Sequence, residues 1–458
     1  MYDVIVIGGG FAGLSAGVQL SGAGRRVLVL EARPGLGGRA TAFTDPETGE
    51  PVDNGQHVLI GCYRETFRFL RTIGAAQDVR LQPRLAVDMI DRRGRRSRLK
   101  CPALPAPWHL LVGLLGWDAL GPGDRLATLR IAPALRAAQR HLRLGTADPG
   151  IAPDETVEQW LIARGQNARV REMLWEPLAL AALNQSPRDA AAAPFVRVLA
   201  EMFGRDPAAA AIGLPDKPLD RLYAEPAQRF IEAHGGAVRT NAPARVWCDG
   251  ERVSHVTVRQ ERIDAPEVIA AVPWFAMEEL LPEPPQALAG LLRDASRLAS
   301  SPIVTVNLWF DRPVLDVPLL GLPGRTMQWV FEKRLVFGRQ ASHLSLVASG
   351  ASEIVARSND EIARLAVDEI RDALPAAAAA QLKRTQVVRE RRATFSLAPG
   401  GPPRPGTRTP IAGLYLAGDW IETGLPGTIE SAVVSGHAAA SLCRGAASSS
   451  LATPDPAR

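Results

Sequence analysis

Cysteine, tyrosine and lysine are scarce in this chain of 458 residues, which contains four of each. The cysteines are scattered, without a CxxC pair or a metal-ligand spacing, so we expect reduced thiols, no disulfide framework and no metal site. Aromatic residues make up only 5% of the chain, and its net charge of +5 is modest. No basic run is interleaved with aromatic residues, so nucleic acid is not an expected partner.

Long hydrophobic runs are also missing. No segment approaches the ~20 apolar residues that a membrane-spanning helix needs, and the first residues, MYDVIVIG, lack the charged start and cleavage site of a signal peptide. We therefore expect a cytoplasmic protein with peripheral contact at the inner face of the membrane. Residues 106–120, with tryptophans near both ends, fit an interfacial segment and a core helix equally. Residues 92–100 (RRGRRSRLK) predict a charged hairpin or a contact with anionic lipid heads.

The start of the chain carries a nucleotide-binding pattern. Residues 4–7 (VIVI) form an apolar, β-branched run that predicts a strand buried on both faces. Gly8, Gly10 and Gly13 follow as GxGxxG. The first glycine permits a tight turn, the second lets the backbone approach a pyrophosphate, and the third lets the next helix pack closely. This helix should begin near Phe11 and direct its positive end at the phosphates.

A second predicted strand, residues 26–30, ends at Glu31, whose carboxylate can bind the hydroxyl groups of an adenosine ribose. The segment ARPGLGGRA follows directly. Arg33 and Arg39 offer guanidinium groups that match phosphate oxygens, and Gly38 clears the approach. The segment resembles the second signature of the amine oxidase and phytoene desaturase superfamily of flavoproteins. This resemblance implies FAD rather than a nicotinamide cofactor.

The C-terminal part of the chain carries a matching motif. Residues 414–417 predict a short buried strand, Gly418 and Asp419 follow it, and Thr428 opens an apolar helix. This run resembles the C-terminal flavin motif of the same superfamily. The resemblance implies that Asp419 meets the ribityl–pyrophosphate region and that N–H groups at the start of the helix face the flavin. Covalent attachment is not expected, because Cys443 lies well into that helix.

The resemblance also places the backbone of Val246, on a hairpin with a turn at 249–250, against the adenine. Since the motifs come from both ends of the sequence, the cofactor domain must be discontinuous. The residues expected to contact non-covalent FAD are Gly8, Gly10, Phe11, Ala12, Gly13, Glu31, Ala32, Arg33, Gly38, Arg39, Ala40, Gly55, Gln56, His57, Val246, Gly418, Asp419, Thr428, Ile429 and Ala432.

The expected fold class is α/β, a discontinuous Rossmann-type FAD-binding domain with an inserted mixed sheet-and-helix substrate domain and a helical cap. Apolar residues of the first insertion recur at helical spacing, whereas the second contains β runs at 303–310 and 344–348 and a helix at 352–374. We expect the FAD-binding domain at 1–66, 214–270 and 394–444, the helical cap and first part of the substrate domain at 67–213, its second part at 271–393, and a disordered tail at 445–458.

Three segments narrow the resemblance: residues 53–58 (DNGQHV), 175–187 (WEPLALAALNQSP) and 416–436 (LAGDWIETGLPGTIESAVVSG). With them the chain resembles the hydroxysqualene dehydroxylase family over nearly its whole length. The resemblance implies reductive removal of an allylic hydroxyl group from a C30 isoprenoid, giving squalene for hopanoid synthesis. We expect association with squalene or presqualene synthase-type enzymes. The electron donor is unknown, since the sequence has no second dinucleotide motif.

Loss of an allylic hydroxyl group needs an acid at the oxygen, a flavin held against a long apolar slot, and exclusion of water. The resemblance places residues 53–58 beside the isoalloxazine. His57 is then the first candidate acid, since its ordinary pKa is about 6.5, although a structural hydrogen bond is an equal interpretation. Gln56 can orient the hydroxyl group or a flavin edge. Glu176, in the predicted cap, is a further candidate acid, and Asp53 fits a turn or flavin-domain role better than that of an acid.

Three other functions stay open. An oxidative carotenoid-type desaturase would share the fold, the cofactor and the apolar slot. A protoporphyrinogen or amine oxidase is disfavoured, because amine oxidases frame the amine with aromatic side chains. Here Tyr2 and Tyr415 lie in predicted strands, although Phe395 and Trp420 could contribute. A flavin-binding lipid carrier without turnover is the non-enzymatic alternative.

Overall fold

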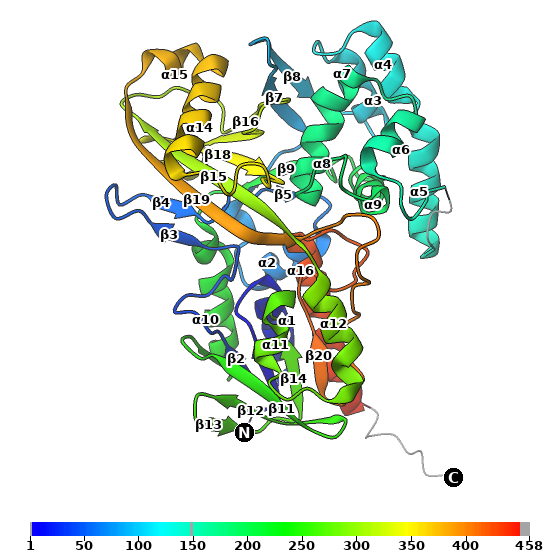
Figure 1. Cartoon of the computed structure of the whole chain (residues 1–458), viewed down its shortest axis with the longest axis vertical. Coiled ribbons are helices and arrows are strands. Elements are labelled where there is room, and N and C mark those ends of the chain that lie inside the picture. Colours follow the sequence, from blue (N-terminus) through cyan, green and yellow to red (C-terminus); the bar gives the residue numbers. More distant parts are fainter. Residues whose placement is uncertain (1, 147–149, 449–458) are drawn as a thin grey trace.

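The structure, a computed structural model, describes residues 2–146 and 150–448. Figure 1 shows a parallel-sheet unit that contains the first and last of the labelled elements, β1 and α16, and, above it, an antiparallel-sheet unit with a group of helices at its side. The predicted α/β class with a Rossmann-type sheet is confirmed. No helix within the described residues is both long enough and apolar enough to cross a bilayer.

Five parallel strands in the order β10–β2–β1–β14–β20 form the centre of the parallel-sheet unit. They are β1 (Val4–Ile7), β2 (Val27–Leu30), β10 (Ala237–Arg239), β14 (Glu267–Ala270) and β20 (Leu414–Leu416). The strand predicted at residues 4–7 is confirmed, and it is buried on both faces. Its side chains alternate, because Val4 and Val6 belong to one core cluster and Ile5 and Ile7 to another.

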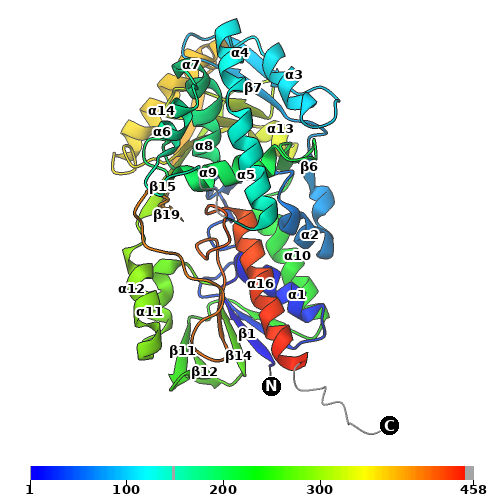
Figure 2. The same ribbon diagram turned by 90° about the vertical axis from the view of Figure 1, so that its right-hand side faces the viewer.

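Helices cover one face of this sheet. Figure 2 shows α1 (Phe11–Ser21), α10 (Glu225–Ala233) and α16 (Ile429–Ser448) side by side, with α2 (Arg64–Thr72) above them. The core on the other face includes the three-stranded antiparallel sheet and two short helices: β11 (Ala244–Asp249), β12 (Arg252–Val258), β13 (Glu261–Ile263), α11 (Met277–Leu280) and α12 (Ala289–Arg297). The helix predicted near Phe11 is confirmed, whereas the hairpin turn lies at Gly250 and Glu251, one residue later than predicted, since Asp249 still pairs with Arg252.

The antiparallel-sheet unit has seven strands in the order β19–β15–β18–β17–β16–β7–β8, with one parallel pairing between β16 and β7. The strands are β7 (Ala86–Ile90), β8 (Arg96–Lys100), β15 (Ser300–Phe310), β16 (Leu319–Gly321), β17 (Trp329–Glu332), β18 (Ser342–Ser349) and β19 (Leu382–Phe395). Helices α14 (Asn359–Ala373) and α15 (Pro375–Ala379) lie beside it, and α14 packs on one face. Residues 92–100 form the turn and second strand of the β7–β8 hairpin, so the hairpin interpretation is confirmed.

The remaining elements connect the two units. The helical group contains α3 (Trp108–Gly116), α4 (Pro122–Leu129), α5 (Ala132–Leu144), α6 (Val157–Ala163), α7 (Ala168–Val170), α8 (Glu176–Leu183) and α9 (Ala192–Met202). Two π-helical segments are η2 (Arg171–Trp175) and η3 (Asp220–Ala224), and the 3-10 turns are η1 (Ala76–Asp78), η4 (Trp274–Ala276) and η5 (Gln286–Leu288). Short strands β3 (Ala42–Thr44), β4 (Pro51–Asp53), β5 (Leu59–Ile60), β6 (Val79–Leu81) and β9 (Ile212–Pro215) and helix α13 (Lys333–Phe337) complete the fold.

Several sequence-based boundaries need correction. The segment 67–213 is not uniformly helical, because β6, β7, β8 and β9 also lie in it. The helix predicted at 352–374 begins only at Asn359, since Ser358 accepts a hydrogen bond from Glu361 N–H and caps it. Helix α16 continues to Ser448, into the segment predicted as a disordered tail, and residues 449–458 lie outside the described residues. The domain boundaries as a whole stay predictions.

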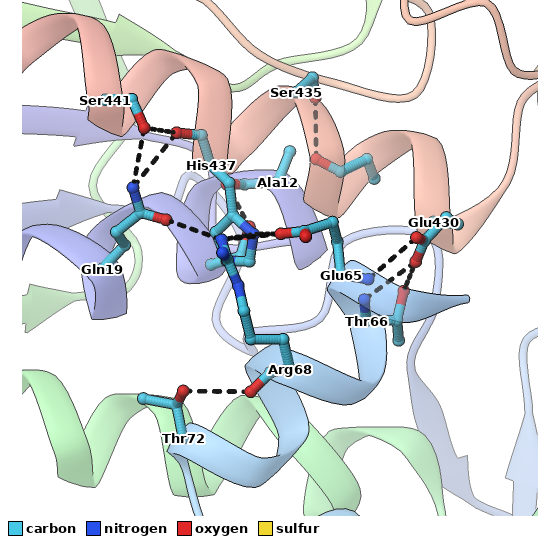
Figure 3. Close-up of polar contacts among 12 residues, drawn as sticks. Ala12, Gln19, Glu65, Thr66, Arg68, Thr72, Glu430, Ser435, His437 and Ser441 are labelled. Carbon is cyan, nitrogen blue, oxygen red and sulfur yellow. Dashed lines mark hydrogen bonds and ion pairs between the residues drawn. The ribbon is translucent and has the colours of Figure 1, made fainter. Parts of the chain in front are cut away.

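Helix α16 is tied to α1 and α2 by contacts that include those drawn in Figure 3. The carboxylate of Glu430 accepts hydrogen bonds from the backbone N–H groups of Glu65 and Thr66, at 3.0 and 2.9 Å, and so satisfies the start of α2. Gly436 lets α16 approach α1 closely, because a Cβ there would collide with the carbonyl oxygen of Ala12. This packing brings the first glycine turn next to the C-terminal motif.

Candidate active site

A cavity of about 640 Å³ lies between the two units and is lined by segments from most of the chain. Most of the predicted cofactor contacts line it: Gly8, Gly10, Phe11, Ala12, Glu31, Ala32, Arg33, Gly38, Arg39, Ala40, Gly55, Gln56, His57, Gly418, Asp419, Thr428, Ile429 and Ala432. The fold therefore gathers the motifs from both ends of the sequence around one volume.

The three glycines of the first turn serve different purposes. A Cβ at Gly8 would collide with the carbonyl oxygen of Ala271, and one at Gly13 with that of Gly8, so protein packing itself requires both. Gly10 differs, because the nearest protein atoms to a Cβ there would be 3.9 Å away. Its missing side chain leaves cavity space at the start of α1, where the first N–H groups have no intrahelical partner. A pyrophosphate fits both the space and the donors.

Glu31 stands at the end of β2, and backbone donors fix its carboxylate in the cavity wall. Oε2 accepts a hydrogen bond from Gly9 N–H at 2.7 Å, and Oε1 accepts one from Arg33 N–H at 2.9 Å. Each oxygen of a carboxylate can accept more than one hydrogen bond. The group is therefore held in place and still able to bind ribose hydroxyl groups.

Arg39 joins the two flavin motifs directly. Its guanidinium group forms an ion pair with Asp419, and Nη1 donates to the carbonyl oxygen of Ala393 at 2.7 Å. Beneath this pair, the Tyr223 hydroxyl group donates to the carbonyl oxygen of Gly37 at 2.8 Å and so anchors the glycine-rich loop. Arg39 and Asp419 thus place one cation and one anion of the chain where the N-terminal and C-terminal flavin motifs meet.

The side of the cavity toward the antiparallel-sheet unit is largely apolar. Strands of that unit and helices of the group beside it supply Leu85, Val87, Met89, Leu99, Leu174, Leu178, Met202, Phe203, Leu319, Trp329, Phe331 and Val347. Two polar residues, Asn54 and Glu390, line the border of this region, where the Asn54 amide donates to the Glu390 carboxylate at 3.0 Å. Such a wall suits a hydrocarbon ligand that places one polar group at the border.

The segment 53–58 contacts both units, because the Asn54 amide donates to the carbonyl oxygen of Arg39 at 3.2 Å and to the Glu390 carboxylate at 3.0 Å. Gln56 and His57 line the cavity, whereas Asp53 is buried behind them at the end of β4. Lys333, the first residue of α13, is only 1% exposed. Its Nζ donates to Asp53 Oδ2 at 2.5 Å and also to Gln56 Oε1. Asp53 is thus engaged in a buried ion pair and is not among the residues that line the cavity.

Burial lowers the pKa of His57 below its ordinary value. The negative charge of Asp53 opposes this effect, and the positive charges of Lys333 and Arg39 reinforce it. The imidazole is therefore mainly neutral at neutral pH. A neutral imidazole donates one hydrogen bond, but only the doubly protonated fraction is an effective acid, and this fraction grows as the pH falls.

Glu176 does not line the cavity, so the structure does not support its candidacy as an acid at the reacting group. The cavity side of this helical stretch is formed by Leu174, Pro177, Leu178 and Ala181, at helical spacing. Glu176 lies two residues from Leu174 and two from Leu178, so it faces away from that side. Burial raises the pKa of its carboxyl group without bringing it to the cavity.

Two predicted cofactor contacts also lie outside the cavity lining. Val246 packs its side chain into the core, and residues 242–244 line the cavity in its place, at the start of β11. Gly13 is one turn into α1, where it serves the helix–strand packing that was predicted for it. Phe395 and Trp420, considered as members of an aromatic cage, are buried in the core and do not line the cavity.

The sequence analysis missed Lys333, Asn54 and Glu390. The scarcity of lysine was a usable signal, because the other lysines are exposed and Lys333 is buried. A buried lysine needs an anionic partner, but the sequence around Lys333 does not identify Asp53 as that partner. Glu390 lies among the arginines of β19, and nothing local distinguishes it from a surface residue.

Comparisons with known proteins relate the chain to flavoenzymes. Residues 11–443 match the family model described as flavin-containing amine oxidoreductase. A hydroxysqualene dehydroxylase from Rhodopseudomonas palustris is 31% identical over 96% of this chain and 97% of its own length. A 15-cis-phytoene desaturase from an Oncidium hybrid cultivar is 27% identical over 95% of this chain and 76% of its own length. A solved oxidoreductase from Methanosarcina mazei shares the fold, with a TM-score of 0.74 at 18% identity over 95% of this chain and 99% of that one.

Gly10→Val should yield a folded protein without flavin, because the new side chain would occupy cavity space and not protein space. The measurement is the flavin released by acid precipitation per mole of protein, together with the melting temperature. Gly13→Val is the matched variant and should destabilise the fold itself, by ~1–3 kcal/mol or more, since it overpacks the helix against the glycine turn. Full flavin occupancy in Gly10→Val would contradict the assignment of the pyrophosphate site.

Proposed function

The chain belongs to the flavin-containing amine oxidoreductases and is a flavin-dependent oxidoreductase, and from this premise we propose that it removes the allylic hydroxyl group of hydroxysqualene to give squalene. Three features support the proposal. The chain resembles hydroxysqualene dehydroxylases over nearly its full length. The cavity joins a nucleotide-binding cradle to a large apolar wall. Gln56 and His57 line the cavity on a segment that hydrogen-bonds both to Arg39 of the cradle and to Glu390 of β19. That last observation carries the proposal, because the substrate is a long hydrocarbon with one polar group.

The cofactor of the proposed reaction is non-covalent FAD. The carboxylate of Glu31 suits the adenosine ribose, and the space at Gly10 suits the pyrophosphate. Arg39 and the start of α16 line the part of the cavity that we assign to the flavin ring. None of the four cysteines lines the cavity, which supports attachment without a thioether bond.

When bound and reduced, the flavin supplies a hydride to the allylic carbon. The C–O bond of the substrate breaks, and the departing oxygen takes up a proton and leaves as water. The chain must hold the hydrocarbon, exclude other water and donate hydrogen bonds at the oxygen. The apolar wall performs the first two tasks, and Gln56 and His57 are positioned for the third. An external reductant must then reload the flavin, and association with squalene or presqualene synthase-type enzymes stays a proposal.

Anaerobic single turnover tests the proposed direction of electron flow. Reduced enzyme mixed with hydroxysqualene should form squalene as the absorbance of oxidised flavin returns. This experiment does not depend on the unidentified electron donor. An oxidative desaturase would behave in the opposite way, because a squalene-type hydrocarbon would bleach oxidised flavin while hydroxysqualene left reduced flavin unchanged. That result would overturn the function and leave the fold and family standing.

His57→Gln should retain flavin but slow this single turnover by roughly 10²–10⁴-fold, the range for loss of a general acid. Burial lowers the pKa of His57, so the imidazole is mainly neutral at neutral pH. Its protonated fraction increases as the pH falls. The rate for the unmodified enzyme should therefore rise between about pH 8 and about pH 6, and His57→Gln should lose this rise. A near-normal rate with an unchanged pH profile in His57→Gln would remove His57 from the mechanism.

We also propose peripheral contact with an anionic bilayer through one surface of the helical group. The docking surface consists of Leu104, Trp108, Val112 and Leu115, whose exposed fractions are 37%, 56%, 44% and 38%. Their spacing places the last three on one side of α3, so this helix is not the core helix that the sequence also allowed.

Charge and position both favour a membrane as the occupant of this surface. Helix α3 packs on the end of β8, since a Cβ at Gly113 would lie 3.2 Å from the carbonyl oxygen of Lys100. On that strand Arg98 and Lys100 are exposed, and Leu99 between them lines the cavity. Cations therefore border the apolar docking surface, and the apolar wall of the cavity lies directly behind it.

Replacing both Trp108 and Leu115 by serine should weaken binding to vesicles that contain phosphatidylglycerol by about tenfold or more, because two apolar side chains no longer enter the bilayer. Vesicle co-sedimentation measures the effect, and flavin content should not change. Phe43→Ser is the control, since Phe43 is also exposed but lies on the β3–β4 hairpin. Equal binding by all three proteins would show that the docking surface does not contact membranes.

A further inference from the structure

Lys333 is the buried cation closest to the candidate reacting groups, and its surroundings leave little freedom. Its side chain is 1% exposed. The ammonium group donates to Asp53 Oδ2 and to Gln56 Oε1, and it lies 4.4 Å from the centroid of the Phe337 ring. An ammonium group has three N–H donors, and these three contacts occupy them. Asp53, itself 4% exposed, supplies the compensating charge.

The contact with Lys333 fixes which end of the Gln56 amide faces the cavity. An ammonium group donates hydrogen bonds and accepts none, so the amide oxygen of Gln56 must be the atom that faces it. The NH₂ group then points to the opposite side. Gln56 lines the cavity, and within the described residues its amide nitrogen has no protein hydrogen-bond acceptor. Its two N–H donors are therefore available to a ligand.

We infer that Lys333, held by Asp53, is a positioning residue that locks Gln56 as a hydrogen-bond donor to the hydroxyl oxygen of the substrate. The identity of this ligand rests on the proposed function. A locked donor favours loss of the hydroxyl group, because negative charge develops on the oxygen as the C–O bond lengthens. A freely rotating amide would present its carbonyl oxygen part of the time, and two acceptors facing each other repel.

Position and residue type also favour a dedicated role for this lysine. The chain uses arginine for almost all of its cations, and the other three lysines are exposed. An ammonium group is compact, and it can meet a carboxylate and an amide in a space that excludes a planar guanidinium group. Lys333 lies on the antiparallel-sheet unit, whereas Asp53 is the last residue of β4 and Gln56 follows it. The orientation of Gln56 therefore depends on contact between segments far apart in the sequence.

Binding to the oxidised enzyme tests this inference without turnover. The probe is the methyl ether of hydroxysqualene, whose oxygen accepts hydrogen bonds but cannot donate them. Its dissociation constant is compared with that of squalene by perturbation of the flavin absorbance. The unmodified protein should bind the ether about 2- to 12-fold more tightly relative to squalene than a protein without the donor does, the range for one neutral hydrogen bond.

Two variants should lose this preference. Gln56→Glu keeps the contact with Lys333 and the Lys333–Asp53 pair but replaces the NH₂ group by an acceptor. The double variant Lys333→Met with Asp53→Asn removes both buried charges together, so neither is left unpaired, and it unlocks the amide. Lys383→Met, which alters an exposed lysine, is the control and should keep the full preference.

The outcomes separate this inference from the proposed function. An unchanged ether preference in Gln56→Glu overturns the inference, even if the double variant fails to fold. Loss of the preference in Gln56→Glu alone, with the folded double variant unaffected, would assign the donor to Gln56 but remove Lys333 from its control. If instead squalene bleaches the oxidised flavin during the titration, the proposed function fails, and the ether binding still reports on the orientation of Gln56.

Discussion

The contact between α1 and α16 is the constraint on which the rest of the site depends. Gly436 permits it, because any side chain there would meet the backbone of α1 at Ala12. Ser435 of α16 accepts a hydrogen bond from the N–H of Gly418 and donates one to its carbonyl group, at 2.8 and 2.9 Å, and so ties α16 to the turn after β20. Closing a chain of this length costs entropy, although the cost grows slowly with loop length. A continuous helix–helix interface of small residues offsets that cost and places both flavin motifs on one cavity.

The parts of the fold that could be predicted from the sequence are those that local geometry controls. The strand at residues 4–7, the glycine turn and the helix at Phe11 follow from side-chain alternation, steric space and helix capping within a short segment. The motif predicted separate roles for its three glycines. The structure identifies the atoms involved, because Gly8 and Gly13 are required by nearby protein atoms while Gly10 faces open cavity.

The parts that could not be predicted depend on contacts between distant segments. Lys333 and Asp53 meet through the packing of α13 against the end of β4. The sequence around either residue gives no indication that the other is its partner. Glu176 was misplaced because its candidacy rested on membership of a segment, whereas the phase of the helix decides which side chains reach the cavity. Val246 lies two residues beyond residues 242–244, which line the cavity, and the contact of its backbone with the adenine stays a prediction.

The buried ion pair between Lys333 and Asp53 bears on the choice between the two main enzymatic functions. Taking two charges out of water is costly, and apolar replacements for such pairs are often neutral or stabilising. Stability alone therefore gives little reason for this pair behind the cavity wall. A desaturase acting on a pure hydrocarbon has no substrate heteroatom for Gln56 to address, so there the oriented amide would be left with an edge of the flavin. The hydroxyl oxygen of a substrate would accept a hydrogen bond from the amide. The ion pair would then serve to orient that amide. The same burial that lowers the pKa of His57 strengthens hydrogen bonds at this border. The polar groups at residues 53–57 therefore support the proposed dehydroxylation by their geometry, in a segment that also carries part of the sequence resemblance.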